Sequence, residues 1–275
     1  MAPRTMWKGA ISFGLVSIPV RVFPATEEKT VRFNQLHDAD GGRIKMKRTC
    51  SKCGEEVAFE NIVKGYETEK DHYVILTDED FDAVPVESSR AIDIVQFVDL
   101  EEIDPMFFKK SYYLVPEETG VKAYSLLRKA LSEDGKVGIA KVSFRDKEHL
   151  AALRFRGKTF VLETMYWPDE LRADDFEELD KKVTVRPQEV QMARSLIDNL
   201  SESWNPEAFT DEYREALLKI VAAKESGEVI EAPQIEQSSK VVDLMEALKA
   251  SVEAVKKESA AAKKKPATKK KKAAS

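Results

Sequence analysis

The feature that most constrains the fold is a succession of short apolar runs in the first 170 residues. The runs are rich in β-branched and aromatic residues, and glycine, proline or charged residues separate them, as is typical of β-strands. Helical spacing occurs only after Thr77 and over Ala123–Leu131, with Gly135 shortly beyond. Many strands with few helices favour a barrel or a sandwich. The predicted strands lie within Trp7–Val22, His72–Leu76, Ala91–Val98, Ser111–Val115, Ile139–Arg145, Leu150–Arg156 and Thr159–Met165.

The character of the chain changes after about residue 170. Pro187 suits the first turn of an amphipathic helix, and a second helix begins near Thr210 and stops at Gly227. A polar linker and a third amphipathic helix follow, and the remaining residues cannot bury a core. We therefore expect a mainly β protein with some α, divided into a β core over 1–170, a helical arm over 171–228, a linker with an amphipathic helix over 229–258, and a disordered tail rich in lysine and alanine over 259–275.

The net charge of −5 hides a strong asymmetry. Residues 256–275 hold nine lysines and one acidic residue, formally +8, so the rest of the chain holds 35 basic and 48 acidic residues, formally −13. An acidic body with a basic tail indicates a local contact with nucleic acid. The tail can also be a plain solvated end, but a disordered polycation still neutralises phosphates. The tail residues predicted to bind DNA are Lys263, Lys264, Lys265, Lys269, Lys270, Lys271 and Lys272.

Basic residues alternate with apolar ones in three predicted strands, so that each strand has one basic and one apolar face. An ordinary amphipathic sheet would carry charges of both signs on its outer face, whereas these faces are nearly all positive in an acidic body. They predict a surface that contacts phosphates without reading the base sequence. The predicted DNA-binding residues are Arg43, Lys45 and Lys47 with the adjacent Arg48, Lys141 and Arg145, and Arg154 and Arg156.

The two cysteines, Cys50 and Cys53, form one C-x-x-C with the spacing of a zinc knuckle. A tetrahedral zinc site needs four ligands, and the local candidates for the other two are His37 and Asp40. The alternative is that packing holds the hairpin and that both thiols are free, since a lone C-x-x-C is half a site. A structural zinc is therefore one possibility for this segment, and a redox role lacks a thioredoxin-like context.

Motifs of common catalytic sites are missing: there is no Gly-rich phosphate loop, no G-x-S-x-G and no H-E-x-x-H. Acidic runs such as Asp78–Asp80 could hold Mg²⁺ in a nuclease, but they more often form first turns of helices. The sequence thus predicts a non-enzymatic protein that requires no cofactor. It has no apolar signal region and no segment of about 20 apolar residues, so we expect a cytoplasmic protein without a membrane partner.

Several motifs, in order along the chain, resemble the prokaryotic Ku family, the DNA-end-binding proteins of bacterial non-homologous end joining. Because many motifs occur in register from about Trp7 to Glu228, the resemblance is more specific than any one of them. The motifs are Trp7–Val20, Leu36–Asp40 with the following Arg-Ile-Lys, Cys50-x-x-Cys-Gly54, Val63–Glu67, Lys122–Arg128, Gly138–Val142 and Lys147–Arg154, and Val241–Val252 resembles the last helix of the family.

The resemblance implies a β-barrel core with extended arms, which in two subunits close a ring around duplex DNA. It implies a homodimer that binds linear double-stranded ends, recruits and stimulates the ATP-dependent ligase of end joining (ligase D), and associates with the nucleoid. The bridge of the ring has been compared to a zinc ribbon, which concerns the Cys50 segment. Two other classes stay open on the residues alone: a histone-like compaction protein and a metal-dependent nuclease.

Overall fold

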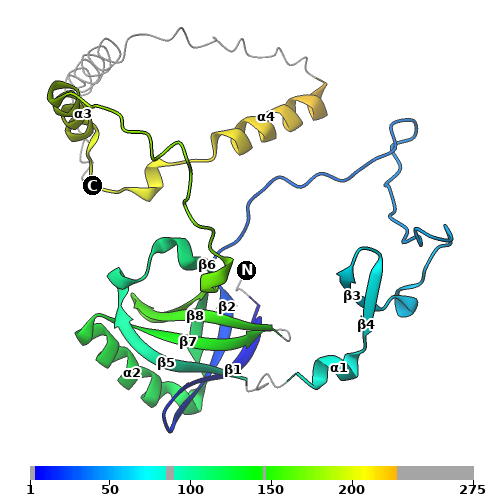
Figure 1. Cartoon of the computed structure of the whole chain (residues 1–275), viewed down its shortest axis with the longest axis horizontal. Helices are drawn as coiled ribbons and strands as arrows, with labels where there is room; N and C mark the ends of the chain where they lie inside the picture. Colours follow the sequence, from blue (N-terminus) through cyan, green and yellow to red (C-terminus); the bar gives the residue numbers. More distant parts are fainter. Residues whose placement is uncertain (1–3, 85–89, 145–146, 228–275) are drawn as a thin grey trace, which may run out of the picture. The chain divides into compact units, whose positions relative to one another are not determined.

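The computed structural model describes residues 4–84, 90–144 and 147–227 (Figure 1). The chain divides into two compact units, Met1–Asp174 and Asp175–Ser275. Within the described residues, no helix is both long and apolar enough to span a membrane. The predicted linker, the helix over Val241–Val255 and the lysine tail lie outside the described residues.

The first unit contains a closed seven-stranded barrel, which confirms the predicted mainly β core. Six of its strand pairings are antiparallel, and the parallel pairing of β1 with β5, from Ala10 opposite Ala91 to Ser12 opposite Asp93, closes it. The strands follow the order β1 (Trp7–Phe13), β2 (Val16–Pro24), β6 (Phe108–Pro116), β9 (Thr159–Met165), β8 (Lys147–Arg156), β7 (Lys136–Phe144) and β5 (Ala91–Asp99).

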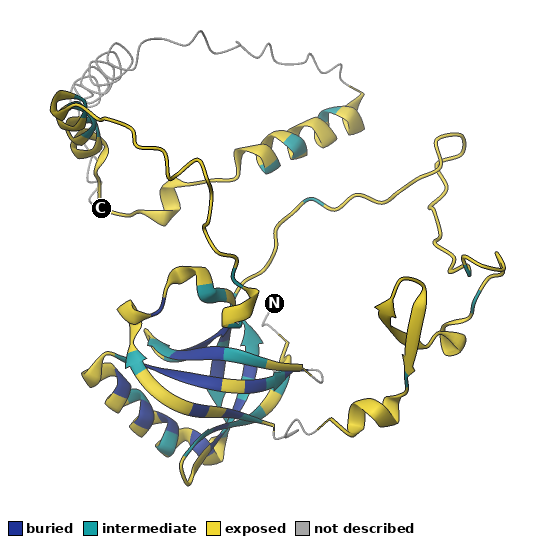
Figure 2. Cartoon of the chain, viewed as in Figure 1, coloured by how far each residue is buried: buried dark blue, intermediate teal, exposed yellow. Residues whose placement is uncertain are grey.

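The barrel interior is filled by the alternate side chains of its strands. Val142 and Phe144 are buried, as is Leu153 opposite Leu162, so the predicted apolar faces of β7 and β8 are confirmed (Figure 2). Helix α2 (Val121–Asp134) leaves β6 through η4 (Glu118–Gly120) and adds Tyr124, Leu127 and Leu131 to the same core. The Tyr124 hydroxyl donates to the Leu114 carbonyl at 2.8 Å and accepts from the Phe160 N–H at 2.8 Å, so the helix is bonded to two strands.

A second apolar cluster lies on the outer side of the barrel wall. The connection from β5 to β6 contains η2 (Leu100–Glu102) and η3 (Pro105–Phe107). Its residues Ile103 and Phe107 pack with Ile139, Ala152 and Met165. The outer face of β7 to β9 is therefore partly covered by the protein's own chain, and is not one continuous basic surface.

Residues 25 to 90 form a long insertion between β2 and β5, which we call the arm. It contains η1 (Phe59–Asn61), the hairpin of β3 (Lys64–Glu69) and β4 (His72–Leu76), and α1 (Asp78–Asp82). The prediction of a strand over Arg43–Lys47 is wrong: only isolated bridges occur there, Leu36 with Arg43 and Thr49 with Glu56. Ile44 and Met46 are exposed, so this segment has no apolar face to bury against a sheet.

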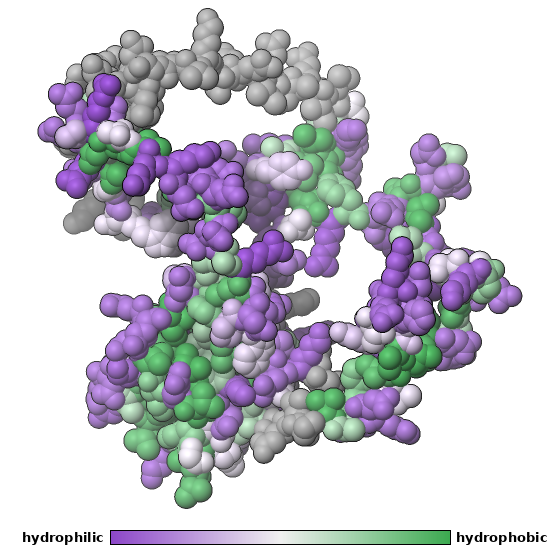
Figure 3. All heavy atoms as spheres, viewed as in Figure 1, coloured by the Kyte–Doolittle hydropathy of each residue, from purple (hydrophilic) through white to green (hydrophobic). Residues whose placement is uncertain are grey.

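The second unit contains the two predicted helices, α3 (Pro187–Leu200) and α4 (Glu212–Ser226), with η6 (Pro206–Ala208) between them; η5 (Pro168–Glu170) follows β9 in the first unit. Gly227 ends α4 in the left-handed conformation, as predicted. Neither helix buries a residue, and Figure 3 shows hydrophobic surface on both. The exposed apolar residues here include Ile197, Leu200, Trp204, Phe209, Tyr213 and Leu218.

Candidate nucleic-acid interface

One end of the barrel gathers lysine and arginine side chains from four strands. This is the end at which β1, β5, β6 and β8 begin and β7 and β9 finish. The pairing of Phe144 with Lys147 places the end of β7 beside the start of β8, and that of Phe108 with Met165 places the start of β6 beside the end of β9. The arm leaves the barrel here after Pro24 and returns here to β5. All the gathered cations are exposed, and we call them the basic rim: Lys8, Arg90, Lys109, Lys110 and Lys147.

The positive charges of two basic-rim lysines affect the pKa of His149. Burial is the main cause that lowers the pKa of His149, and the charges of Lys109 and Lys147 lower it further, against an opposing effect of Glu170. Lys109 also lies over the ring of Tyr166, with 4.5 Å from its Nζ to the ring centroid. An aromatic ring holds this ammonium group in place without neutralising it, so its charge stays available to an anion.

Lys141, on β7, is half exposed and faces outward, as the alternation predicted. Its Nζ lies 3.5 Å from a carboxylate oxygen of Glu148 and 5.9 Å from the ring centroid of Trp167. An exposed pair of this kind is weak and exchanges readily with another anion. Lys141 thus remains available to a phosphate, whereas the other predicted residue of this strand, Arg145, lies outside the described residues.

Arg154 is engaged in a structural ion pair. Its Nε donates to Glu163 Oε2 at 2.7 Å and its Nη2 to Oε1 at 2.9 Å, while the Ser111 hydroxyl donates to the same carboxylate at 3.1 Å. Hydrogen bonding by Glu163 raises the pKa of Arg154, and hydrogen bonding by Arg154 lowers the pKa of Glu163. Sequence alternation could not reveal this partner, which belongs to the neighbouring strand. Arg156, two residues further on β8, is exposed and forms no ion pair with a described residue.

The predicted basic residues of the arm are all exposed, but three of them already have partners. Arg43 donates to the Asn34 side-chain oxygen at 2.6 Å, and Lys47 forms an ion pair with Glu56 at 2.6 Å. The guanidinium of Arg48 lies 5.3 Å from the ring centroid of Phe59. These contacts order the segment without burying its charges, and Lys45 is exposed between them.

The four proposed zinc ligands occupy two turns of the same local geometry. The N–H of His37 donates to the Gly42 carbonyl and that of Gly41 to the His37 carbonyl, each at 2.8 Å. In the second turn, the N–H of Cys50 donates to the Glu55 carbonyl and that of Gly54 to the Cys50 carbonyl, again at 2.8 Å. Gly41 and Gly54, which end the two turns, both have positive φ. Each turn therefore presents its first and fourth residues as a knuckle would.

The chemistry of these side chains suits zinc, since two thiols and an imidazole are among its preferred ligands. The backbone N–H groups of Cys53 and Lys52 lower the pKa of the Cys50 thiol, which favours the thiolate that binds metal. The two turns are not joined into one site, however. His37 Nδ1 contacts Asp40 at 3.0 Å, and no cluster of three candidate metal ligands occurs among the described residues. Zinc binding therefore stays a prediction.

Comparison with known proteins decides the family. Residues 12–192 match the family model Ku, described as the "Ku70/Ku80 beta-barrel domain". The chain belongs to the Ku family. Proteins named "Non-homologous end joining protein Ku" from Frankia casuarinae, Heliobacterium modesticaldum and Archaeoglobus fulgidus are 50%, 47% and 44% identical to it, over 92%, 93% and 92% of this chain.

The chain spans 64% of the Frankia relative's length, but 94% and 100% of the Heliobacterium and Archaeoglobus relatives. Among solved structures, the SPOC domain of human PHD-finger protein 3 aligns over 59% of this chain at 12% identity and a TM-score of 0.29, which is too low to support an argument. Membership of the Ku family of end-joining proteins confirms the resemblance read from the sequence and agrees with the expected non-catalytic scaffold.

Within this Ku fold, the predicted DNA-binding residues that the structure describes come from two regions, the barrel wall and the arm. Lys141 and Arg156 lie on the barrel wall and Arg43 to Arg48 on the arm, while Arg145 and all seven tail lysines lie outside the described residues. Sequence reasoning missed the basic rim, because its members become neighbours only when the barrel closes. The sequence does hold one indication of the rim, because each of these cations lies at or beside the end of a strand.

Proposed function

We propose that this protein binds the ends of linear double-stranded DNA in non-homologous end joining, without regard to base sequence. The observation that carries the proposal is the match of the Ku family model over residues 12–192, together with relatives named for this pathway. Supporting it, the rim, the barrel wall and the arm expose lysine and arginine side chains, which are common ligands of backbone phosphates. Binding of this kind would place the protein on the nucleoid.

We further propose that two chains form a ring around the duplex. A ring needs intersubunit contacts, and both the arm and the second unit expose apolar residues that a partner could bury. On the arm these include Tyr66 and Val74 on the β3–β4 hairpin, and Phe81 on α1 (Figure 3). The acidic excess of the chain outside its tail would repel DNA from the outer surface and confine affinity to the enclosed channel.

We also propose that the segment Pro187–Lys257 recruits and stimulates ligase D. Its described helices bury none of their residues and leave apolar side chains such as Ile197 and Tyr213 available to a partner. The segment exposes more apolar surface than a small helical unit needs for its own packing. The second unit thus offers exposed apolar side chains both to a second copy of the chain and to the ligase.

Competition between DNA topologies tests the central proposal. Labelled linear duplex is bound to a chain truncated after Glu258, then challenged with a closed circle or with the same circle cut once. A ring loads at ends, so the cut circle should compete and the closed circle should not. Equal competition by the two circles would contradict end binding and favour histone-like compaction, because an open basic face binds every phosphate alike.

A further inference from the structure

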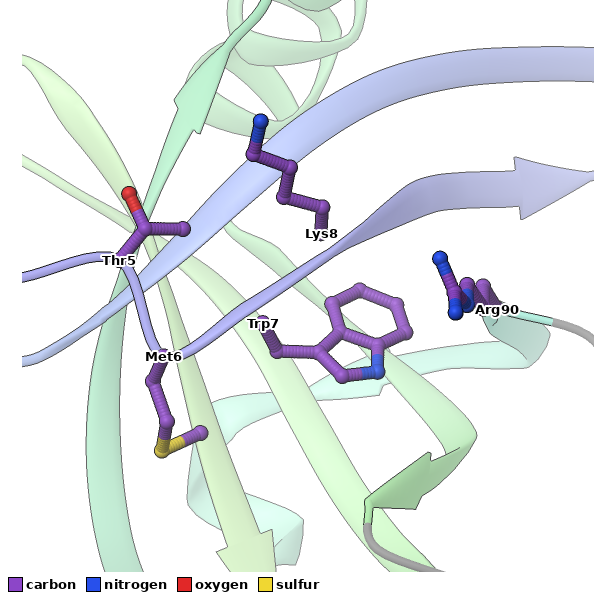
Figure 4. Close-up of a pocket in the computed structure, with 5 residues that line it drawn as sticks. All are labelled: Thr5, Met6, Trp7, Lys8 and Arg90. Atoms are coloured by element: carbon purple, nitrogen blue, oxygen red, sulfur yellow. The ribbon is translucent and has the colours of Figure 1, made fainter.

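A pocket lies on the basic rim where β1 meets the start of β5 (Figure 4). It has a volume of about 380 Å³ and is lined by Thr5, Met6, Trp7, Lys8 and Arg90. Figure 4 shows the Arg90 guanidinium extending toward the indole of Trp7, and the Thr5 hydroxyl and the Lys8 ammonium pointing to a common side. A volume near 300 Å³ is the lower limit for small-molecule sites, so the pocket fits one small group.

Glycine at position 9 allows this pocket to form. A Cβ at Gly9 would lie 2.0 Å from the Trp7 ring and 2.1 Å from the Arg90 carbonyl oxygen, so any side chain there would displace both. The same Arg90 carbonyl accepts from the Ala10 N–H at 2.8 Å, which fixes the backbone of Arg90 against β1. The pocket is therefore assembled by close backbone packing and is not a chance gap between mobile side chains.

The floor of the pocket is rigid as well. Trp7 packs edge-on against Phe144, with ring centroids 5.4 Å apart and planes at 86°, and its backbone pairs with Val22. Because Trp7 is partly buried and packs against the barrel core cluster, the backbone on either side of it is held in place. Lys8 thus projects from a strand whose geometry is set by the core.

The two cations of the pocket are not neutralised by the part of the chain that the structure describes. No carboxylate in residues 4–84, 90–144 or 147–227 forms an ion pair with Lys8 or Arg90. Some other barrel cations do have such partners, as Arg154 does with Glu163 and Lys136 with Asp99. Lys8, Arg90 and the Thr5 hydroxyl all line this pocket, and their donors suit an anion with several acceptor oxygens.

We propose that this pocket binds a phosphate group of DNA, with Lys8 and Arg90 as the charged ligands and Thr5 as a hydroxyl donor. The inference rests on the proposed DNA binding and names residues for it that alternation along strands does not identify. Phosphate fits the charge, the small volume and the position of the pocket at the end of the barrel where Lys109 and Lys147 also lie. The phosphate could be an internal backbone diester or the monoester at a 5′ end, and the experiment separates these two sources.

The test measures the affinity of the full chain for a short linear duplex as a function of salt. Loss of the one phosphate contact should reduce the log–log salt slope by up to about 0.9. The test variant is Lys8→Ala with Arg90→Ala. Its charge-matched control is Lys122→Ala with Lys129→Ala on α2, which connects strands at the opposite end of the barrel. A further variant, Lys8→Arg with Arg90→Lys, keeps both charges and should keep the slope.

Each variant is measured on duplexes that carry either a 5′-phosphate or a 5′-hydroxyl. A reduced slope on both duplexes supports the site with a backbone phosphate as its ligand, and a reduced slope on the 5′-phosphate duplex alone supports it with a terminal one. A slope equal to that of the control variant on both duplexes overturns the inference. If the unmodified chain does not bind linear duplex at all, the proposed function fails first, which is a separate result.

Discussion

The ion pair between Arg154 and Glu163 gives the sharpest test of how the barrel is stabilised. Replacing Arg154 by methionine would leave the Glu163 carboxylate, only 11% exposed, with the Ser111 hydroxyl as its hydrogen-bond donor among the described residues. Removing one partner costs about 3–5 kcal/mol in a buried pair, while an exposed pair contributes about 0–1 kcal/mol. Arg154 is 26% exposed, so the pair lies between these limits, and we expect a loss of about 2 kcal/mol.

Thermal unfolding measures this loss. A decrease of about 2 kcal/mol should lower the Tm by about 4–8 °C, at about 2–4 °C per kcal/mol for a domain of this size. Arg156→Met is the matched control: it removes a cation from the same face of β8 that has no ion pair among the described residues and acts on Glu163 only through its charge, so the Tm should fall far less. The double variant Arg154→Met with Glu163→Leu should recover most of the loss, because no charge is then left unpaired.

The same pair predicts a dependence of stability on pH. The folded pKa of Glu163 is below its ordinary value of 4.5, so the stabilisation is fully present above about pH 4.5 and is lost as the pH falls through the lower folded value. The Arg154→Met variant should lack this acid-dependent loss. An Arg154→Met protein with the Tm of the parent at pH 7 would refute the reasoning, because it would mean that water already solvates the carboxylate.

Three further outcomes follow from the charged surfaces and the cysteines. Truncation after Glu258 removes seven clustered lysines and should flatten the salt slope by up to about 6 without unfolding the barrel, so an unchanged slope would show that the tail does not touch DNA. Elemental analysis of untagged protein distinguishes the two readings of the cysteines: a structural zinc predicts one zinc per chain, lost on Cys50→Ser with Cys53→Ser, whereas free thiols predict substoichiometric zinc and an unchanged Tm in chelator. A folded chain ending near Leu171 should fail to retain ligase D in a pull-down, and full retention would refute recruitment by the helical segment.

The strands of the barrel were predictable because their inner faces follow a period of two. Val142, Phe144 and Leu153 could be placed in the core from alternation alone, since strands that enclose a core must bury every second residue. Arg154 follows the same alternation, but its role depends on Glu163 in a neighbouring strand. Alternation specifies the face on which a side chain lies, and not what lies opposite.

The arm shows the opposite case, in which alternation predicts a strand that does not form. Arg43, Lys45 and Lys47 alternate with apolar residues just as a strand would, yet no strand forms, because the segment has no neighbouring strand with which to share its hydrogen bonds. The rim pocket was also out of reach, since Lys8 and Arg90 are brought together by the closing pair of β1 and β5. Closure of the barrel is a property of the whole first unit, whereas periodicity is local.

The parallel pairing of β1 with β5 has a consequence for the folding of the barrel. The whole arm is a loop that must be closed before Ser12 can pair with Asp93, so this contact forms at a large cost in chain entropy. That cost grows only with the logarithm of loop length, and doubling the arm would add about 0.6 kcal/mol. The barrel should therefore tolerate arms of very different length, while the two pairings that span the arm, β1 with β5 and β2 with β6, are its most non-local contacts and should form slowly.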